Sequence, residues 1–109
     1  MSSTINRIRS FEKIPPNLEY DAVTKAAIEK AIEVHNALPK GIGDRVFPMR
    51  DGGVQFDIDV IDDEFNILTC IEIEVSPKGV VTILHYNSNY DIVKEERNAT
   101  IENVSKLSY

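Results

Sequence analysis

The clearest pattern in the chain is an alternation of apolar and polar residues between positions 51 and 86. Apolar residues occupy the even positions over 54–60 and the odd positions over 67–75, and a third alternating segment covers 80–86. A period of two is typical of β-strands with one buried face. Polar turns separate the three segments, so the pattern predicts an antiparallel meander of three strands.

Two weaker segments extend this predicted sheet. Residues 90–95 follow an Asn-Ser-Asn turn and predict an exposed, acidic fourth strand. Val46, Phe47 and Met49 favour a short strand on the other side. Pro48 confines that strand to a sheet edge, because proline has no amide hydrogen to donate.

Apolar residues three and four positions apart over 17–38 predict an amphipathic helix. Asn17 or Asp21 is suited to cap its start, and Pro39 with Gly41 ends it. Its small alanine flank suits close packing against a sheet.

The two ends of the chain are shorter amphipathic segments. Ile5, Ile8 and Phe11 are three apart within residues 1–16, which form either a short helix or a flexible arm. Asn98 is suited to cap a C-terminal helix. The apolar side of that helix consists of Ile101, Val104 and Leu107.

The strand register follows from burying all the apolar rows on one face, since a slip of one residue would expose a whole row. A four-residue loop between the first two strands then pairs Asp57 with Glu72 and Asp59 with Cys70. A four-residue loop between the second and third strands pairs Cys70 with His85.

These elements predict one domain over residues 1–109, which is too short for a second core. The expected class is α+β, with two layers: an antiparallel three- to four-stranded meander, and an N-terminal and a C-terminal helix packed on one face.

Charge and composition narrow the possible partners. The chain has 18 acidic and 12 basic residues and a net charge of −6, so we expect no nucleic-acid partner. It has no apolar run long enough for a bilayer and no apolar signal segment at its start, so we expect a cytoplasmic protein that binds no membrane. A single cysteine excludes an intrachain disulfide and a multi-cysteine zinc site.

An acidic patch is predicted on the polar face of the sheet, formed by Asp57, Asp59, Glu72 and Glu74. Like charges opposite each other cost stability, so this cross-strand arrangement needs an explanation. Three remain open: a solvated polar face, a basic protein partner, or a divalent cation. The spacing matches no known oxygen-ligand loop, so we predict no metal or other cofactor.

The same register places Val81 and Ile83 on the polar face, beside Glu72 and Glu74. Exposed apolar residues next to charged ones are typical of an interface centre. A homodimer through this face or through an unpaired sheet edge is an alternative use of the surface.

A second candidate is the row Asp59, Cys70 and His85. An acid, a thiol and an imidazole in line suit a cysteine nucleophile or a metal ion. No glycine-rich turn or helix N-terminus lies beside Cys70 to stabilise a thiolate or an oxyanion, so we predict no catalytic residue here.

The order of these segments resembles a group of small, mostly uncharacterised bacterial proteins. Members have a DGG-x-Q-hydrophobic-acidic strand followed by an I-E-I-E-V strand, and the function of the group is unknown. The matching segments here are Leu38-Pro39, Phe47-Pro48, 51–57, 71–75, Lys78-Gly79 and 98–107. The resemblance implies the fold described above and no activity.

The sequence therefore predicts a non-enzymatic, bacterial or phage-encoded module that binds a protein, which its acidity suggests is basic. Inhibitors, antitoxins, immunity proteins and phage-encoded antagonists are of this type. The partner-binding residues are expected to be Asp57, Asp59, Glu72, Glu74, Val81 and Ile83. The alternatives are an enzyme or metal protein using Asp59, Cys70 and His85, and a structural self-associating domain.

Overall fold

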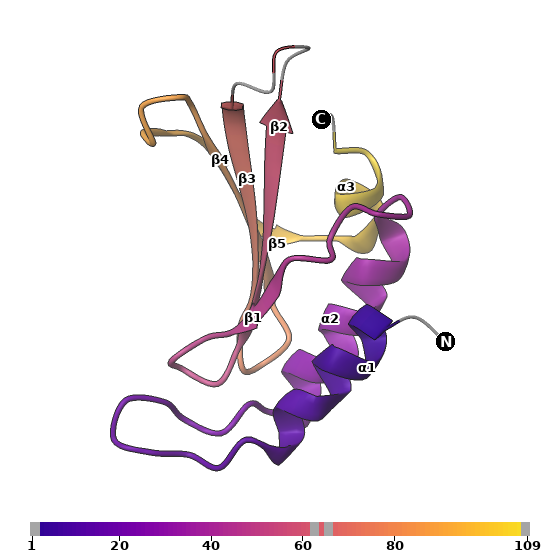
Figure 1. Ribbon diagram of the computed structural model, residues 1–109, viewed down its shortest axis with the longest axis vertical. Helices are drawn as coiled ribbons and strands as arrows, with labels where there is room; N and C mark the ends of the chain where they lie inside the picture. The colour runs from indigo at the N-terminus through magenta and orange to yellow at the C-terminus, as the bar shows by residue number, and fades with distance from the viewer. Residues whose placement is uncertain (1–2, 62–63, 65–66, 108–109) are drawn as a thin grey trace.

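The computed structural model describes residues 3–61, 64 and 67–107, and it has an α+β fold (Figure 1). Its elements in chain order are α1 (Ser3–Ser10), the 3₁₀ helix η1 (Phe11–Lys13), α2 (Lys25–Ala37), β1 (Val46–Pro48), β2 (Val54–Ile61), β3 (Ile67–Val75), β4 (Val81–Tyr86), β5 (Ile92–Ala99) and α3 (Ile101–Ser105). The strands form one antiparallel sheet in the order β1-β2-β3-β4-β5. The meander thus has five strands, where the sequence predicts three or four and a separate edge strand.

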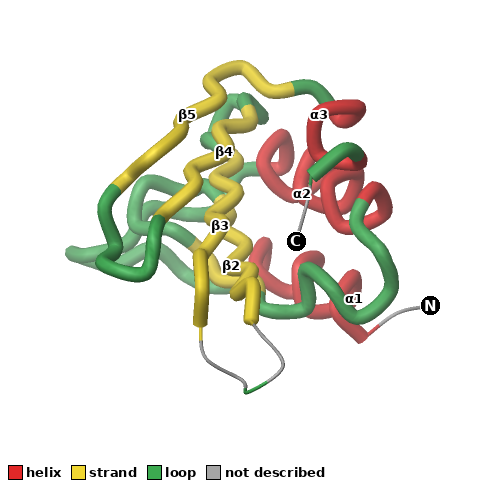
Figure 2. Tube along the Cα trace, turned by 90° about the horizontal axis from the view of Figure 1, so that it is seen from above, coloured by secondary structure: helices red, strands yellow, loops and turns green. Residues whose placement is uncertain are grey.

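The helices lie together on one side of the sheet, as Figure 2 shows from above. The core between the two layers takes the alternate apolar residues of the strands, such as Phe56 and Ile73, which are fully buried. Ala27 and Ala31 are also fully buried. Their small side chains let α2 approach the sheet closely, which is the role that the alanine flank predicts.

The register between β2 and β3 confirms the prediction from alternation. Phe56 pairs with Ile73, and Asp57 pairs with Glu72. Because β2 alternates over 54–60 and β3 over 71–75, only registers that differ by two residues keep their apolar rows together, and the short connection selects one of them.

The register between β3 and β4 differs by one residue from the prediction. The Ser76 amide donates to the Val80 carbonyl oxygen at 2.9 Å, so the loop holds three residues and not four. Gly79 closes this loop in the left-handed region at φ +81°, as in three-residue hairpins that end in a left-handed glycine. Cys70 therefore pairs with Tyr86 and not with His85.

The slip exchanges the two faces of β4. Val81 and Ile83 are 3% and 0% exposed, so the prediction that they lie on the polar face is wrong. Thr82, Leu84 and Tyr86 take their place there. The physical reason is that residues 80–84 include apolar side chains at both even and odd positions. Alternation alone therefore does not show which of the two sets is buried.

Helix α2 begins at Lys25, so neither of the predicted caps, Asn17 and Asp21, lies at its start. Thr24 caps it: the Thr24 hydroxyl accepts from the Ala27 amide at 3.1 Å and donates to the Pro77 carbonyl at 2.6 Å. Asn17 instead organises a turn, because its side-chain oxygen accepts from the amides of Glu19 and Tyr20 at 2.8 and 3.0 Å.

The N-terminal segment is a short helix, one of the two forms that the sequence allows, with Ile8 and Phe11 buried in the core. Helix α3 is capped by Thr100 and not by Asn98, which has a positive φ of 52°. None of the helices in the described part of the chain is long and apolar enough to cross a membrane.

Candidate functional site

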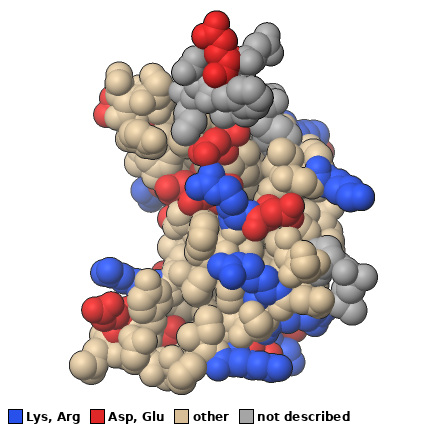
Figure 3. All heavy atoms as spheres, viewed as in Figure 1, with Lys and Arg blue, Asp and Glu red and all other residues tan. Residues whose placement is uncertain are grey.

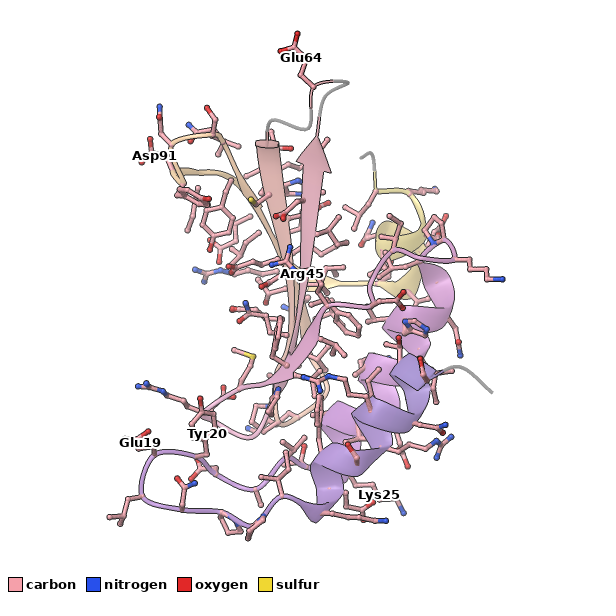
Figure 4. The ribbon with its side chains drawn as sticks, in the orientation of Figure 1. Glu19, Tyr20, Lys25, Arg45, Glu64 and Asp91 are labelled. Atoms are coloured by element: carbon pink, nitrogen blue, oxygen red, sulfur yellow. The ribbon has the colours of Figure 1, made fainter. Side chains whose placement is uncertain are left out.

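The outer face is the side of the sheet that the helices leave uncovered. Its central residues are Gln55, Asp57 and Asp59 on β2, Cys70, Glu72 and Glu74 on β3, and Thr82, Leu84 and Tyr86 on β4. The β4–β5 turn projects beyond one end of this face, and the loop before α2 projects beyond the other (Figure 1). Figure 3 shows a hollow between these two projections, and Figure 4 places Asp91 on the first and Glu19 and Tyr20 on the second.

The four predicted acidic residues do lie together on the outer face. Asp57 is directly opposite Glu72, with Asp59 and Glu74 as the next residues on the same face of their strands. Of the four, Asp59 alone has an ion pair within the described residues, to Arg45 at 2.6 Å. The other three carboxylates have no neutralising cation there.

Hydrogen bonds from uncharged groups hold two of these carboxylates in place. The Gln55 amide donates to Asp57 Oδ1 at 2.8 Å, and the Tyr86 hydroxyl donates to Glu72 Oε2 at 3.1 Å. Such bonds orient a carboxylate and leave its negative charge uncompensated, so the outer face keeps an excess of negative charge.

The pKa shifts on this face have the same origin. Burial, and then the negative charges of Glu72, Asp51 and Glu95, raise the pKa of the Glu74 carboxyl. Burial and the bond to Glu72 raise the pKa of Tyr86 to about 12. Both shifts indicate a partly desolvated, electronegative surface, in which one more negative charge is unfavourable.

A pocket of about 270 Å³ lies at the β4–β5 end of the hollow, lined by Arg45, Asp57, Asp59, Cys70, Glu72, Tyr86 and Tyr90 among others. Tyr90 has a φ of 63° and remains 68% exposed. A large side chain seldom adopts this conformation, and an exposed aromatic ring beside carboxylates is a common interface anchor. The sequence predicts Tyr90 as the first residue of a strand over 90–95, but β5 covers Ile92–Ala99, and the Tyr90 amide donates to the Asn87 carbonyl in the preceding turn at 3.0 Å.

The predicted row of Asp59, Cys70 and His85 is only partly formed. Cys70 Sγ lies 3.3 Å from Asp59 Oδ1, so this neighbour relation is confirmed. His85 is on the other face of β4, where its Nε2 is 2.9 Å from Glu96 Oε2. The prediction that His85 stands beside Cys70 is therefore wrong, and its cause is the register slip described above.

The surroundings of Cys70 also disfavour a nucleophile. Burial, and then the bond to Asp59, raise the pKa of the thiol, whereas a reactive cysteine needs a lowered one. Within the described residues, His, Cys, Asp and Glu side chains form no group of three or more able to hold a metal ion.

No protein-family model, no curated protein and no solved structure matches this chain.

Proposed function

We propose that this protein is a binding module that captures a basic protein through the outer face of its sheet. Some inhibitors, antitoxins, immunity proteins and phage-encoded antagonists work in this way, by occupying a positively charged site on their target.

One observation carries the proposal: Asp57, Glu72 and Glu74 are adjacent carboxylates without an ion pair among the described residues. Opposed like charges on neighbouring strands destabilise a sheet. A partner that brings lysine or arginine side chains relieves this cost on binding, and long-range attraction accelerates the encounter.

The shape of the face supports the same use. Asp57, Asp59 and Glu72 line a pocket that the exposed ring of Tyr90 also lines, and Ile92, which pairs with Tyr86, is 56% exposed on the neighbouring β5. An exposed aromatic ring beside oriented carboxylates combines an anchor with charge selectivity.

Arg45 indicates which chemical group fits. Its guanidinium lies at 2.6 Å from Asp59 Oδ2, on the edge of the acidic row. The chain thus already places one guanidinium on this surface, and arginine side chains of the partner fit the remaining carboxylates in the same way.

Affinity capture with the immobilised chain tests this function. The wild type is expected to retain basic proteins from a lysate, identified by mass spectrometry. An Asp57→Lys/Glu72→Lys variant should lose them, with at least about a tenfold weaker affinity, because interfacial charge pairs couple by about 1.5 kcal/mol or more.

An Asn36→Lys/Glu102→Lys/Ser105→Lys variant is the matched control. It changes the net charge by the same four units through exposed residues of α2 and α3, on the helix side of the molecule. If the outer-face variant and this control retain the same proteins equally well, the outer face is not the interface.

A further inference from the structure

A second hollow lies on the helix side of the molecule, between α1–η1 and the first turns of α2. We call it the basic groove, and it has a volume of about 810 Å³. The turn between β3 and β4 closes one end of it. Its cationic residues are Arg9, Lys13, Lys25, Lys30 and Lys78.

The groove has the opposite charge to the rest of the protein. It holds five of the 12 basic residues and three of the 18 acidic ones, a local excess of two positive charges in a chain of net charge −6. Lys30 is paired with Glu33 at 2.9 Å. The other four cations make no ion pair within the part of the chain that the structure describes.

The backbone around the groove is well held. The bond from the Thr24 hydroxyl to the Pro77 carbonyl, at 2.6 Å, ties the start of α2 to the β3–β4 turn. This bond fixes Lys25 and Lys78 on neighbouring elements at one end of the groove. The N-terminus of α2, a helix of 13 residues, adds positive potential at the same end.

We propose that the basic groove binds an acidic segment of a partner protein. Carboxylates of such a segment would meet the unpaired cations. Glu12 and Glu29, which also line the groove, and the partly buried Ile32 would meet its cationic and apolar side chains. The groove is thus lined by cationic, acidic and apolar side chains. Such a lining matches a protein segment, because a protein segment carries charged and apolar side chains in turn.

The same features disfavour other polyanions. A nucleic-acid backbone repeats one negative charge and would be repelled by the groove carboxylates and by the net charge of −6. An anionic bilayer surface would be repelled in the same way, by the groove carboxylates and by the net charge of −6. The helices that line the groove lie on one side of the sheet (Figure 2), so the groove is a surface separate from the acidic outer face.

Fluorescence anisotropy with a labelled peptide of alternating Glu and Leu tests the proposal. The full chain is expected to bind this peptide at low salt, and a Lys25→Glu/Lys78→Glu variant should bind it at least about tenfold more weakly. A Lys40→Glu/Lys106→Glu variant, with the same change in net charge away from the groove, should bind it like the wild type. The Asp57→Lys/Glu72→Lys variant should keep groove binding, so that failure of this proposal is separate from failure of the outer face.

Four results would overturn the proposal. The first is that the wild type does not bind the peptide, and the second is that both lysine variants lose affinity for the peptide equally. The third is that the wild type binds oligothymidylate or phosphatidylserine vesicles more tightly than the peptide. The fourth is that the wild-type chain forms oligomers that are absent in the Lys25→Glu/Lys78→Glu variant. The last result would identify a second copy as the occupant. Circular dichroism of each variant shows whether its fold is retained.

Discussion

At the scale of single residues, Glu74 is a charged residue of the outer face that lowers the stability of the fold. It lies beside Glu72 on the same strand face, and burial with nearby negative charge raises its pKa. The folded state therefore holds the ionised form of Glu74 less well than the unfolded state does. A residue kept for stability alone would not be placed here, which agrees with a binding role for the face.

Replacing this carboxylate gives a prediction with a defined pH dependence. Glu74→Gln should raise the free energy of unfolding at neutral pH by about 0.5 kcal/mol, within the range of cross-strand charge pairs. The folded pKa lies above the unfolded value of about 4.3, so the cost of Glu74 is absent below that value and grows as the pH rises through the folded pKa. The gain from the substitution should therefore vanish in acid.

Urea denaturation at several pH values measures this gain. Glu19→Gln, in the exposed loop before α2, is the matched control and should change little at any pH. A Glu74→Gln variant that is less stable than the wild type at neutral pH would contradict the account of this face.

At the scale of elements, the β3–β4 hairpin decides which side chains the outer face presents. Its loop of three residues ends at Gly79, whose φ of +81° favours glycine. A four-residue loop over 76–79 would instead pair Val75 with Val80. That register would place Val81 and Ile83 on the outer face. The loop, and not the strands, therefore sets the outer face of β4.

Two substitutions at Gly79 test this role. Gly79→Ala should lower the free energy of unfolding by about 1 kcal/mol, because alanine resists the left-handed conformation, and Gly79→Asn should lower it less, because asparagine tolerates it. An added Cβ would meet the Ala26 carbonyl oxygen at 3.4 Å, so crowding adds little to either substitution. If thermal and urea unfolding give equal stability for both variants and the wild type, the left-handed turn does not hold the register.

The hairpins also show where sequence reasoning succeeds and where it stops. Strict alternation over 54–60 and 71–75 leaves one face to bury, so the pairing of Asp57 with Glu72 is predictable. Residues 80–84 include apolar side chains at both even and odd positions, so alternation does not fix which face of β4 is buried. The face of Tyr86 depends on the length of the β3–β4 loop, and the sequence predicts the wrong one. Tyr90 and Arg45 reach the site from a turn and a loop, which no periodicity describes.

At the scale of the whole molecule, the sheet places acidic and basic surfaces on opposite layers and leaves two edges. Arg7 closes the β1 edge: its Nε donates to the Val46 carbonyl at 3.0 Å, and Pro48 shortens the strand. The β5 edge is longer and exposed. Register shifts near both of its ends and the left-handed Asn98 make it irregular, and irregular edges resist pairing with another chain.

This arrangement bears on the homodimer through the sheet face or edge that the sequence leaves open as an alternative. With Val81 and Ile83 buried and Leu84 only 9% exposed, the outer face lacks the exposed apolar centre expected for a homodimer, and the β5 edge carries the ion pair of Arg97 with Glu95 at 3.0 Å. We therefore expect the chain alone to be a monomer of 12.3 kDa by multi-angle light scattering at neutral pH. A Glu95→Thr/Arg97→Thr variant, which keeps the net charge but removes this ion pair and two of the four charged residues of β5, should associate as its concentration rises. A wild-type dimer that survives high salt would show instead that the edge is an interface, and the acidic and basic surfaces would then be properties of that dimer.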